Sequence, residues 1–119
     1  MESILNSVKQ LLGINEEDTH FDLDIIIHIN SIFATLNQMG VGPETTFSIT
    51  DESTIWSEFT DEDVDFSNVK TYMFLKVKLI FDPPASSSVL SAIERQISEL
   101  EWRLTVRASD KAMEEAENE

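Results

Sequence analysis

His20, Asp22, Asp24 and His28 are the residues whose types and spacing could bind a metal ion. On a helix, Asp24 and His28 share a face at positions i and i+4, so two ligands could converge. The spacing matches no zinc motif, however, and the nearby acidic loop lacks the glycine and the terminal glutamate of an EF-hand. His28 lies among isoleucines, which is typical of a polar residue at the edge of a helical core. We therefore predict neither a metal site nor a cofactor.

Groups for nucleophilic or acid–base catalysis have no recognisable arrangement either. The chain has no Cys and only two His, and it contains no Gly-x-Ser-x-Gly motif. Three glycines are too few for a phosphate-binding loop. Carboxylate pairs such as Glu16 and Glu17 lie in loops so acidic that we expect them to be solvated rather than to share a proton. We expect no enzymatic activity.

The charge of the chain is its most unusual property. Eight Lys and Arg face 23 Asp and Glu, for a net charge of −15, so the surface repels phosphate backbones. No Lys or Arg lies between Lys9 and Lys70, a span with 13 acids, whereas six of the eight bases lie in residues 70–107. Two interpretations stay open: a solvated acidic face that keeps the protein soluble, or two poles that suit head-to-tail packing of identical copies.

The 119 residues are enough for one domain and too few for two ordinary ones. Without Cys, disulfides and thiolate metal sites are excluded. No stretch approaches the length of a membrane span, and Met1-Glu2-Ser3 is acidic where a signal peptide is basic. We expect a protein that is neither secreted nor associated with a membrane.

Apolar spacing predicts two helices in the first third of the chain. The first covers residues 3–12, with Ser3 as its N-cap and Gly13 as its C-terminal stop. The second begins with Asp22 as its cap and ends at Gly40. Residues between them form a polar loop.

Residues 41–66 form an irregular insertion. Within it, residues 47–50 alternate in polarity like a short strand, and residues 61–65 form a charged loop. Residues 55–59 have the spacing of one or two helical turns, and we expect their aromatic side chains, Trp56 and Phe59, to anchor the insertion to the core.

Residues 67–81 are apolar almost all round, which is typical of a helix at the centre of a bundle or in an oligomer interface. A buried strand is the alternative, but this segment is long for one. Pro83 and Pro84 end the segment. The Ser86-Ser87-Ser88 run then caps a last helix. Its amphipathic seam consists of Val89, Ile93, Ile97, Leu100 and Leu104.

The sequence therefore predicts a mostly α fold: a small four-helix bundle-like domain with an irregular insertion at residues 41–66 and a long C-terminal helix. We divide the chain into a helical domain, residues 1–107, and an acidic tail, residues 108–119. A helix in the tail would bury only a thin stripe of alanines, too little to offset its ordering entropy. We expect the tail to bind a partner.

Trp102 lies off the amphipathic seam, between Glu101 and Arg103. It either covers one edge of the core or belongs to an interface, because exposed Trp and Arg are typical interface hot spots. The sequence leaves both readings open. The candidate surface for subunits or partners consists of Arg95, Trp102, Arg103, Arg107 and Met113.

The order of these elements resembles a known protein family. A short helix ends in Leu11-Leu12-Gly13-Ile14, and the second helix contains Asp24-Ile25-Ile26-Ile27-His28-Ile29-Asn30. The exit Leu36-Asn37-Gln38-Met39-Gly40-Val41-Gly42, the insertion and an apolar helix that ends in Phe81-Asp82-Pro83-Pro84 follow. From residue 3 to about residue 107, the chain is similar to the head–tail connector (adaptor) proteins of long-tailed bacteriophages and prophages.

The resemblance implies a virion protein without enzymatic activity that assembles in the host cytoplasm. Its copies would form a ring, as a rule a dodecamer, beneath the portal of the DNA-filled head and offer a docking surface to stopper or tail-completion proteins. DNA would pass through the ring without specific binding, and an acidic lining would repel its phosphates.

An alternative from another class is a small acidic inhibitor that mimics DNA and occupies a nuclease or repressor. The net charge suits such a protein, but many of the acids lie in loops rather than on a folded face. A third reading is a soluble helical domain with an unknown partner.

Overall fold

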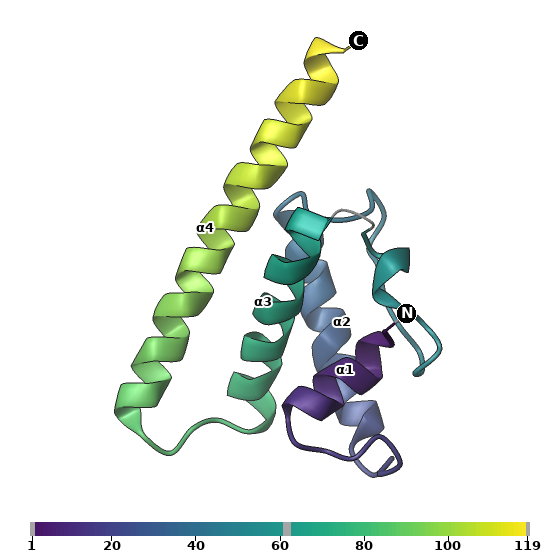
Figure 1. Cartoon of the computed structure of the whole chain (residues 1–119), viewed down its shortest axis with the longest axis vertical. Helices are drawn as coiled ribbons and strands as arrows, with labels where there is room; N and C mark the ends of the chain where they lie inside the picture. Colours follow the sequence, from purple (N-terminus) through teal and green to yellow (C-terminus); the bar gives the residue numbers. More distant parts are fainter. Residues whose placement is uncertain (1, 61–62, 119) are drawn as a thin grey trace.

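Four α-helices form the framework of the computed structural model, which describes residues 2–60 and 63–118 (Figure 1). A short 3-10 helix, η1 (Trp56–Glu58), lies between the second and third of them. No strand occurs among the described residues, which confirms the mostly α fold with a bundle of four helices. The four are α1 (Ile4–Leu11), α2 (Asp22–Gln38), α3 (Asp63–Phe81) and α4 (Ser87–Glu117).

The ends of α1 and α2 follow the local signals in the sequence. The Ser3 hydroxyl accepts a hydrogen bond from the Asn6 backbone N–H at 3.2 Å, which confirms Ser3 as the N-cap of α1. Gly13 and Gly40 have φ angles of 81° and 84°. Each follows the C-cap of its helix in a left-handed conformation that favours glycine, and the 6→1 and 5→2 hydrogen bonds of a Schellman motif close both ends.

The predicted role of Asp22 is wrong. The N-cap of α2 is Phe21, which makes no side-chain capping bond, and Asp22 is the first helical residue. Its carboxylate oxygen Oδ1 lies 2.7 Å from Nζ of Lys9, whose side chain is 1% exposed. The same ammonium donates to the backbone carbonyls of Glu16 and Asp18, at 3.0 and 2.7 Å. A buried cation needs full compensation, so Lys9 recruits Asp22 and thereby joins α1, the loop and α2.

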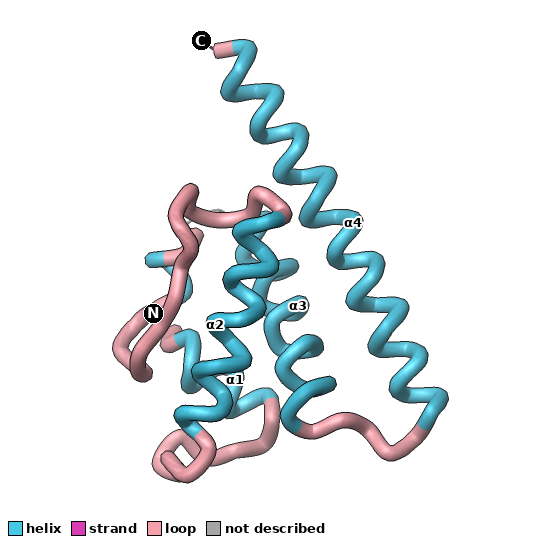
Figure 2. The backbone as a smooth tube through the Cα atoms, turned by 180° about the vertical axis from the view of Figure 1, so that it is seen from behind, coloured by secondary structure: helices cyan, strands magenta, loops and turns pink. Residues whose placement is uncertain are grey.

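Helix α3 is the centre of the bundle and packs against the other three helices (Figures 1 and 2). It runs antiparallel to α2 and α4, and four of its side chains have no exposed surface: Val69, Tyr72, Met73 and Val77. The central helix is thus confirmed and the alternative of a strand is wrong. The predicted charged loop at residues 61–65 is wrong from Asp63 onward, where α3 already begins; residues 61–62 lie outside the described residues. Acidic residues are favoured in the first turn of a helix.

The predicted strand at residues 47–50 is also wrong. Ile49 is buried, and its backbone N–H and C=O pair with the side-chain amide of Asn30 on α2, at 2.8 and 3.0 Å. An amide side chain thus satisfies the two backbone groups that a partner strand would otherwise satisfy. Trp56 and Phe59 are 2% and 5% exposed, which confirms that they anchor the insertion to the core.

Helix α4 begins at the predicted cap, where the Ser86 hydroxyl accepts from the backbone N–H of Val89. Its seam buries Ile93, Ile97, Leu100 and Leu104, whereas Val89 is 47% exposed because it precedes the stretch that packs on α3. The helix continues without a break through Ala108 to Glu117 and projects beyond the rest of the bundle (Figure 1).

Candidate partner interface

The outward face of α4 carries most of the predicted interface residues. At about 100° per residue, Arg95, Trp102 and Met113 lie within an arc of about 40° on the side opposite the buried seam. Val106 lies in the same arc and is 38% exposed. Trp102 is 67% exposed and Met113 is 62% exposed. We call Trp102, Val106 and Met113 the α4 stripe.

The exposure of Trp102 excludes one of its two readings. A side chain that is 67% exposed and turned away from the seam does not cover the edge of the core. An exposed Trp with Val and Met at helical spacing makes an apolar stripe of the kind found in interfaces. The role of this surface as an interface stays a prediction.

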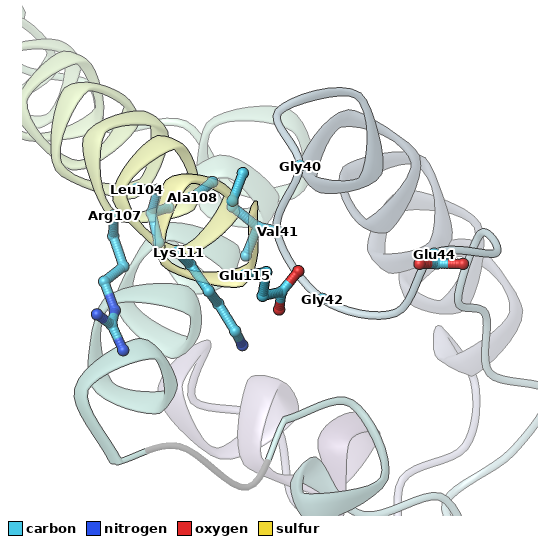
Figure 3. A pocket seen from close by; sticks show the side chains of 10 residues that line it. Gly40, Val41, Gly42, Glu44, Leu104, Arg107, Ala108, Lys111 and Glu115 are labelled. Carbon is cyan, nitrogen blue, oxygen red and sulfur yellow. The ribbon is translucent and has the colours of Figure 1, made fainter. Parts of the chain in front are cut away.

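The remaining two arginines occupy different positions. Arg103 is exposed at the edge of the outward face, and its guanidinium lies 2.6 Å from a carboxylate oxygen of Glu99 one turn earlier. Arg107 is half-buried and belongs to the lining of a cavity beside the loop after α2, although its guanidinium extends away from that loop (Figure 3). The structure therefore groups Arg95, Trp102 and Met113 on one face, places Arg103 beside them and separates Arg107 from them.

Arg107 lines a cavity of about 210 Å³ between α4 and the Gly40–Gly42 loop. Lys111 and Glu115 of α4 lie beside the same loop (Figure 3). Gly40 lies close to α4, because a Cβ at this position would be in ordinary van der Waals contact with that of Ala108, at 3.5 Å. Ala108, which we placed in the tail, thus contacts the main body.

A second exposed apolar face lies on α2, and sequence reasoning missed it. Leu23 and Ile27 are 71% and 56% exposed and are four positions apart on the side opposite the buried residues of α2. A signal was present: the run Ile25-Ile26-Ile27 is apolar all round a helix, although one side of an outer helix faces water. We call Leu23, Ile27 and the half-buried Ala34 the α2 stripe. For Val106, the signal in the sequence was its position four residues after Trp102, which places both side chains on the same face of a helix.

One polar contact joins α4 to the centre of the bundle. The Tyr72 hydroxyl donates a 2.8 Å hydrogen bond to a carboxylate oxygen of Glu101. Burial of the phenol, followed by this hydrogen bond and the negative charge of Glu101, raises the pKa of Tyr72 far above its usual value. The contact lies on the inner side of α4, so it fixes which side of the helix faces outward.

The residues considered for metal binding have separate roles. His20 packs edge-on against the ring of Phe21, with centroids 4.7 Å apart, while Asp22 pairs with Lys9. Asp24 is exposed and His28 is half-buried. In the described part of the chain, no three His, Asp or Glu side chains gather in an arrangement that could hold a metal ion.

Comparison with known families decides the class of protein. A sequence profile of the family described as phage connector protein matches residues 4–111. The chain belongs to this family. The match confirms the resemblance to the head–tail connectors of bacteriophages. The connector is therefore a structural phage protein, and its family is not a class of enzymes. Comparison with curated proteins and with solved structures found no match. No helix among the connector's described residues is long and apolar enough to cross a membrane.

Proposed function

We propose that this connector forms a ring, a dodecamer as in the family it resembles, that joins the portal vertex of the phage head to the neck and tail. The observation that carries the proposal is the family match over residues 4–111. In the ring, each copy contacts the portal and a stopper or tail-completion protein, and DNA passes through the centre. The protein acts in the virion, after assembly in the host cytoplasm. Family membership favours this function over a DNA-mimic inhibitor.

The distribution of charge supports passage of DNA without binding. At least four of the eight bases pair with acids of the same chain in the described residues: Lys9 with Asp22, Lys70 with Glu2, Lys78 with Asp82, and Arg103 with Glu99. These pairs leave few cations for phosphate contacts, while the net charge of −15 opposes them. An acidic passage would repel the DNA backbone from its wall.

The projecting end of α4 supports contact with another protein. Beyond Ala108 its side chains are exposed, apart from the half-buried Lys111, so this part of the helix buries little surface within its own chain (Figure 1). We propose that it reaches the portal or a neighbouring subunit.

Electron microscopy of the full chain mixed with its cognate portal protein tests the ring. We expect an additional ring of density on the portal, absent when the portal is imaged alone. A chain that stays unbound at micromolar concentrations of both proteins would contradict the proposal.

A gel-shift with duplex DNA at about 0.15 M salt tests whether the protein leaves DNA unbound, because electrostatic screening at that ionic strength is similar to that in the cell. We expect no retained DNA, and micromolar binding would argue against a repelling passage.

A further inference from the structure

The α2 stripe and the α4 stripe have the same pattern. Leu23, Ile27 and Ala34 occupy positions i, i+4 and i+11, and Trp102, Val106 and Met113 occupy the same positions on α4. Each stripe therefore extends over about 16 Å of helix, at a rise of about 1.5 Å per residue. The two stripes match in length and in the spacing of their side chains.

The two stripes face different sides of one molecule. Helix α3 lies between α2 and α4, and both outer helices turn their buried faces toward the core (Figures 1 and 2). The stripes therefore cannot meet within one chain. They can meet between two copies, as a heterologous contact in which one copy offers α4 and the next offers α2.

Charge fixes which ends of the two helices meet. The α2 stripe begins at the N-terminal end of α2, where Asp24 is exposed and the preceding loop carries the exposed acids Glu16 and Glu17; none of these three forms an ion pair in the described part of the chain. Arg95, two turns before Trp102 on the same side of α4, is the exposed base at the start of the α4 stripe, whereas the neighbouring Arg103 already pairs with Glu99. Its far end is acidic, with Asp110, Glu114 and Glu117.

A parallel arrangement brings Arg95, at the start of the α4 stripe, to the acidic start of the α2 stripe. An antiparallel arrangement would bring Asp110 and Glu114 to the acidic loop, where like charges repel. Helices α2 and α4 already run in the same direction within one chain, since both are antiparallel to α3 (Figure 1). A rotation about an axis along these helices preserves that direction, so every copy in a closed ring can make the parallel contact.

We propose that the α4 stripe of one copy packs in parallel on the α2 stripe of the next copy, with Trp102 as its largest apolar anchor and Arg95 beside the neighbour's acidic loop. The inference deepens the proposed ring by naming the partner of each surface. It also places each copy's two outer helices in separate interfaces.

Cysteine cross-linking tests this contact directly, because the chain has no native Cys. Three double variants of the full chain are treated with a short bis-maleimide linker, both free at high concentration and bound to the cognate portal. Ile27→Cys with Val106→Cys joins the centres of the stripes. Ala34→Cys with Met113→Cys joins their ends in the parallel arrangement. Leu23→Cys with Met113→Cys joins them only in the antiparallel arrangement.

We expect the first two pairs to produce a ladder of covalent multimers and the third to remain monomeric. The single variant Val106→Cys should remain monomeric as well. Covalent dimers of Val106→Cys alone would show a symmetric contact between two copies of α4 and overturn the proposal. Absence of a ladder in both of the first two pairs, free and on the portal, would also overturn it.

Substitution of Trp102 gives an independent readout of affinity. Trp102→Ala should raise the dissociation constant of self-association at least about tenfold, measured by analytical ultracentrifugation, because a Trp packed in an interface is a typical hot spot. The control, Gln96→Ala, removes an exposed side chain about 120° round the same helix and should leave the constant unchanged. Equal dissociation constants for Trp102→Ala and the unmodified chain would contradict the proposed role of Trp102 as an anchor.

The same experiments separate this inference from the proposed function. A ring on the portal without the predicted ladder retains the connector function and refutes the contact. A ladder in free protein that never binds the portal retains the contact and refutes the function.

Discussion

Trp56 and Trp102 place the same side chain in two regions of different character. Trp56 is 2% exposed, donates a 2.8 Å hydrogen bond from Nε1 to the Ser7 hydroxyl, and packs edge-on against Phe33. Trp102 is 67% exposed on the outward face of α4. The core region around Trp56 holds the insertion to the helices, whereas the outward face around Trp102 adds little to the fold. The region around Trp56 therefore stabilises the fold, and we propose that the region around Trp102 serves assembly.

The sharpest test of this comparison substitutes each tryptophan with alanine. Trp56→Ala should lower the free energy of unfolding by about 3–5 kcal/mol, because it leaves a large cavity and removes the hydrogen bond to the Ser7 hydroxyl. Trp102→Ala should change that free energy by no more than about 0.5 kcal/mol. Urea denaturation of both variants checks the difference. A comparable loss in the two variants would remove the distinction between the regions.

Ion pairs should show the same contrast. Lys9→Met leaves Asp22 and the backbone carbonyls of Glu16 and Asp18 without their cation, and we expect a loss of about 3 kcal/mol. Arg103→Met breaks an exposed pair with Glu99 and should cost about 0.5 kcal/mol or less.

Urea denaturation measures both values. The double variant Lys9→Met with Asp22→Asn serves as the control, because it no longer leaves an uncompensated carboxylate and should recover part of the loss. A double variant no more stable than Lys9→Met would indicate that Asp22 is not the essential partner.

Titration of Tyr72, the only tyrosine, tests whether the contact between α3 and α4 stays closed in the folded protein. This contact joins the core to the helix whose outward face carries Trp102. The pKa of Tyr72 is raised in the folded state, so folding keeps its proton and the free energy of unfolding falls as pH rises above about 10, the unfolded value. We expect no phenolate absorbance until the protein unfolds. Glu101→Gln should lower the pKa of Tyr72, although burial should keep it above the usual value. A folded protein that ionises near pH 10 would indicate that the α3–α4 contact is open.

Truncation of α4 should have the smallest effect on stability. A chain that ends at Arg107 loses the exposed end of the helix and Met113 of the α4 stripe, but only Ala108 and Lys111 among its partly buried residues. We expect the melting temperature to fall by less than about 5 °C, roughly 1 kcal/mol for a domain of this size. Assembly with the portal should weaken or disappear. A larger fall in a thermal melt would place residues 108–119 in the folded core rather than in the tail that we predict.

The fold was predictable where neighbouring residues carry the signal. Ser3 and Ser86 supply the side-chain oxygens of helix caps, and Gly13 and Gly40 favour the left-handed conformation that ends a helix. Such interactions involve residues within about one turn of each other, so they depend little on the rest of the chain. The insertion was harder because its partners are distant: Ile49 pairs with Asn30, not with a second strand.

The candidate interface was predictable in part. Residue types indicated Trp102 and the arginines, because Trp and Arg are frequent in interfaces. The positions of Leu23, Ile27 and Val106 were missed, since helical spacing alone does not say which apolar face of an outer helix is buried. The grouping of Arg107 with the others was a prediction from residue type and charge, and the structure places that residue in the lining of the cavity beside the Gly40–Gly42 loop.

The sequence by itself determined four helices, the ends marked by Ser3, Gly13, Gly40 and Ser86, and the acidic charge, because these follow from periodicity, local capping and composition. Tertiary structure alone decided that Lys9 is buried with Asp22, that Trp56 faces the core and that Trp102 faces outward. The physical reason is that burial is a property of the whole chain. A tryptophan or lysine has the same chemistry in either place, and only the packing of distant segments removes one from water and leaves the other exposed.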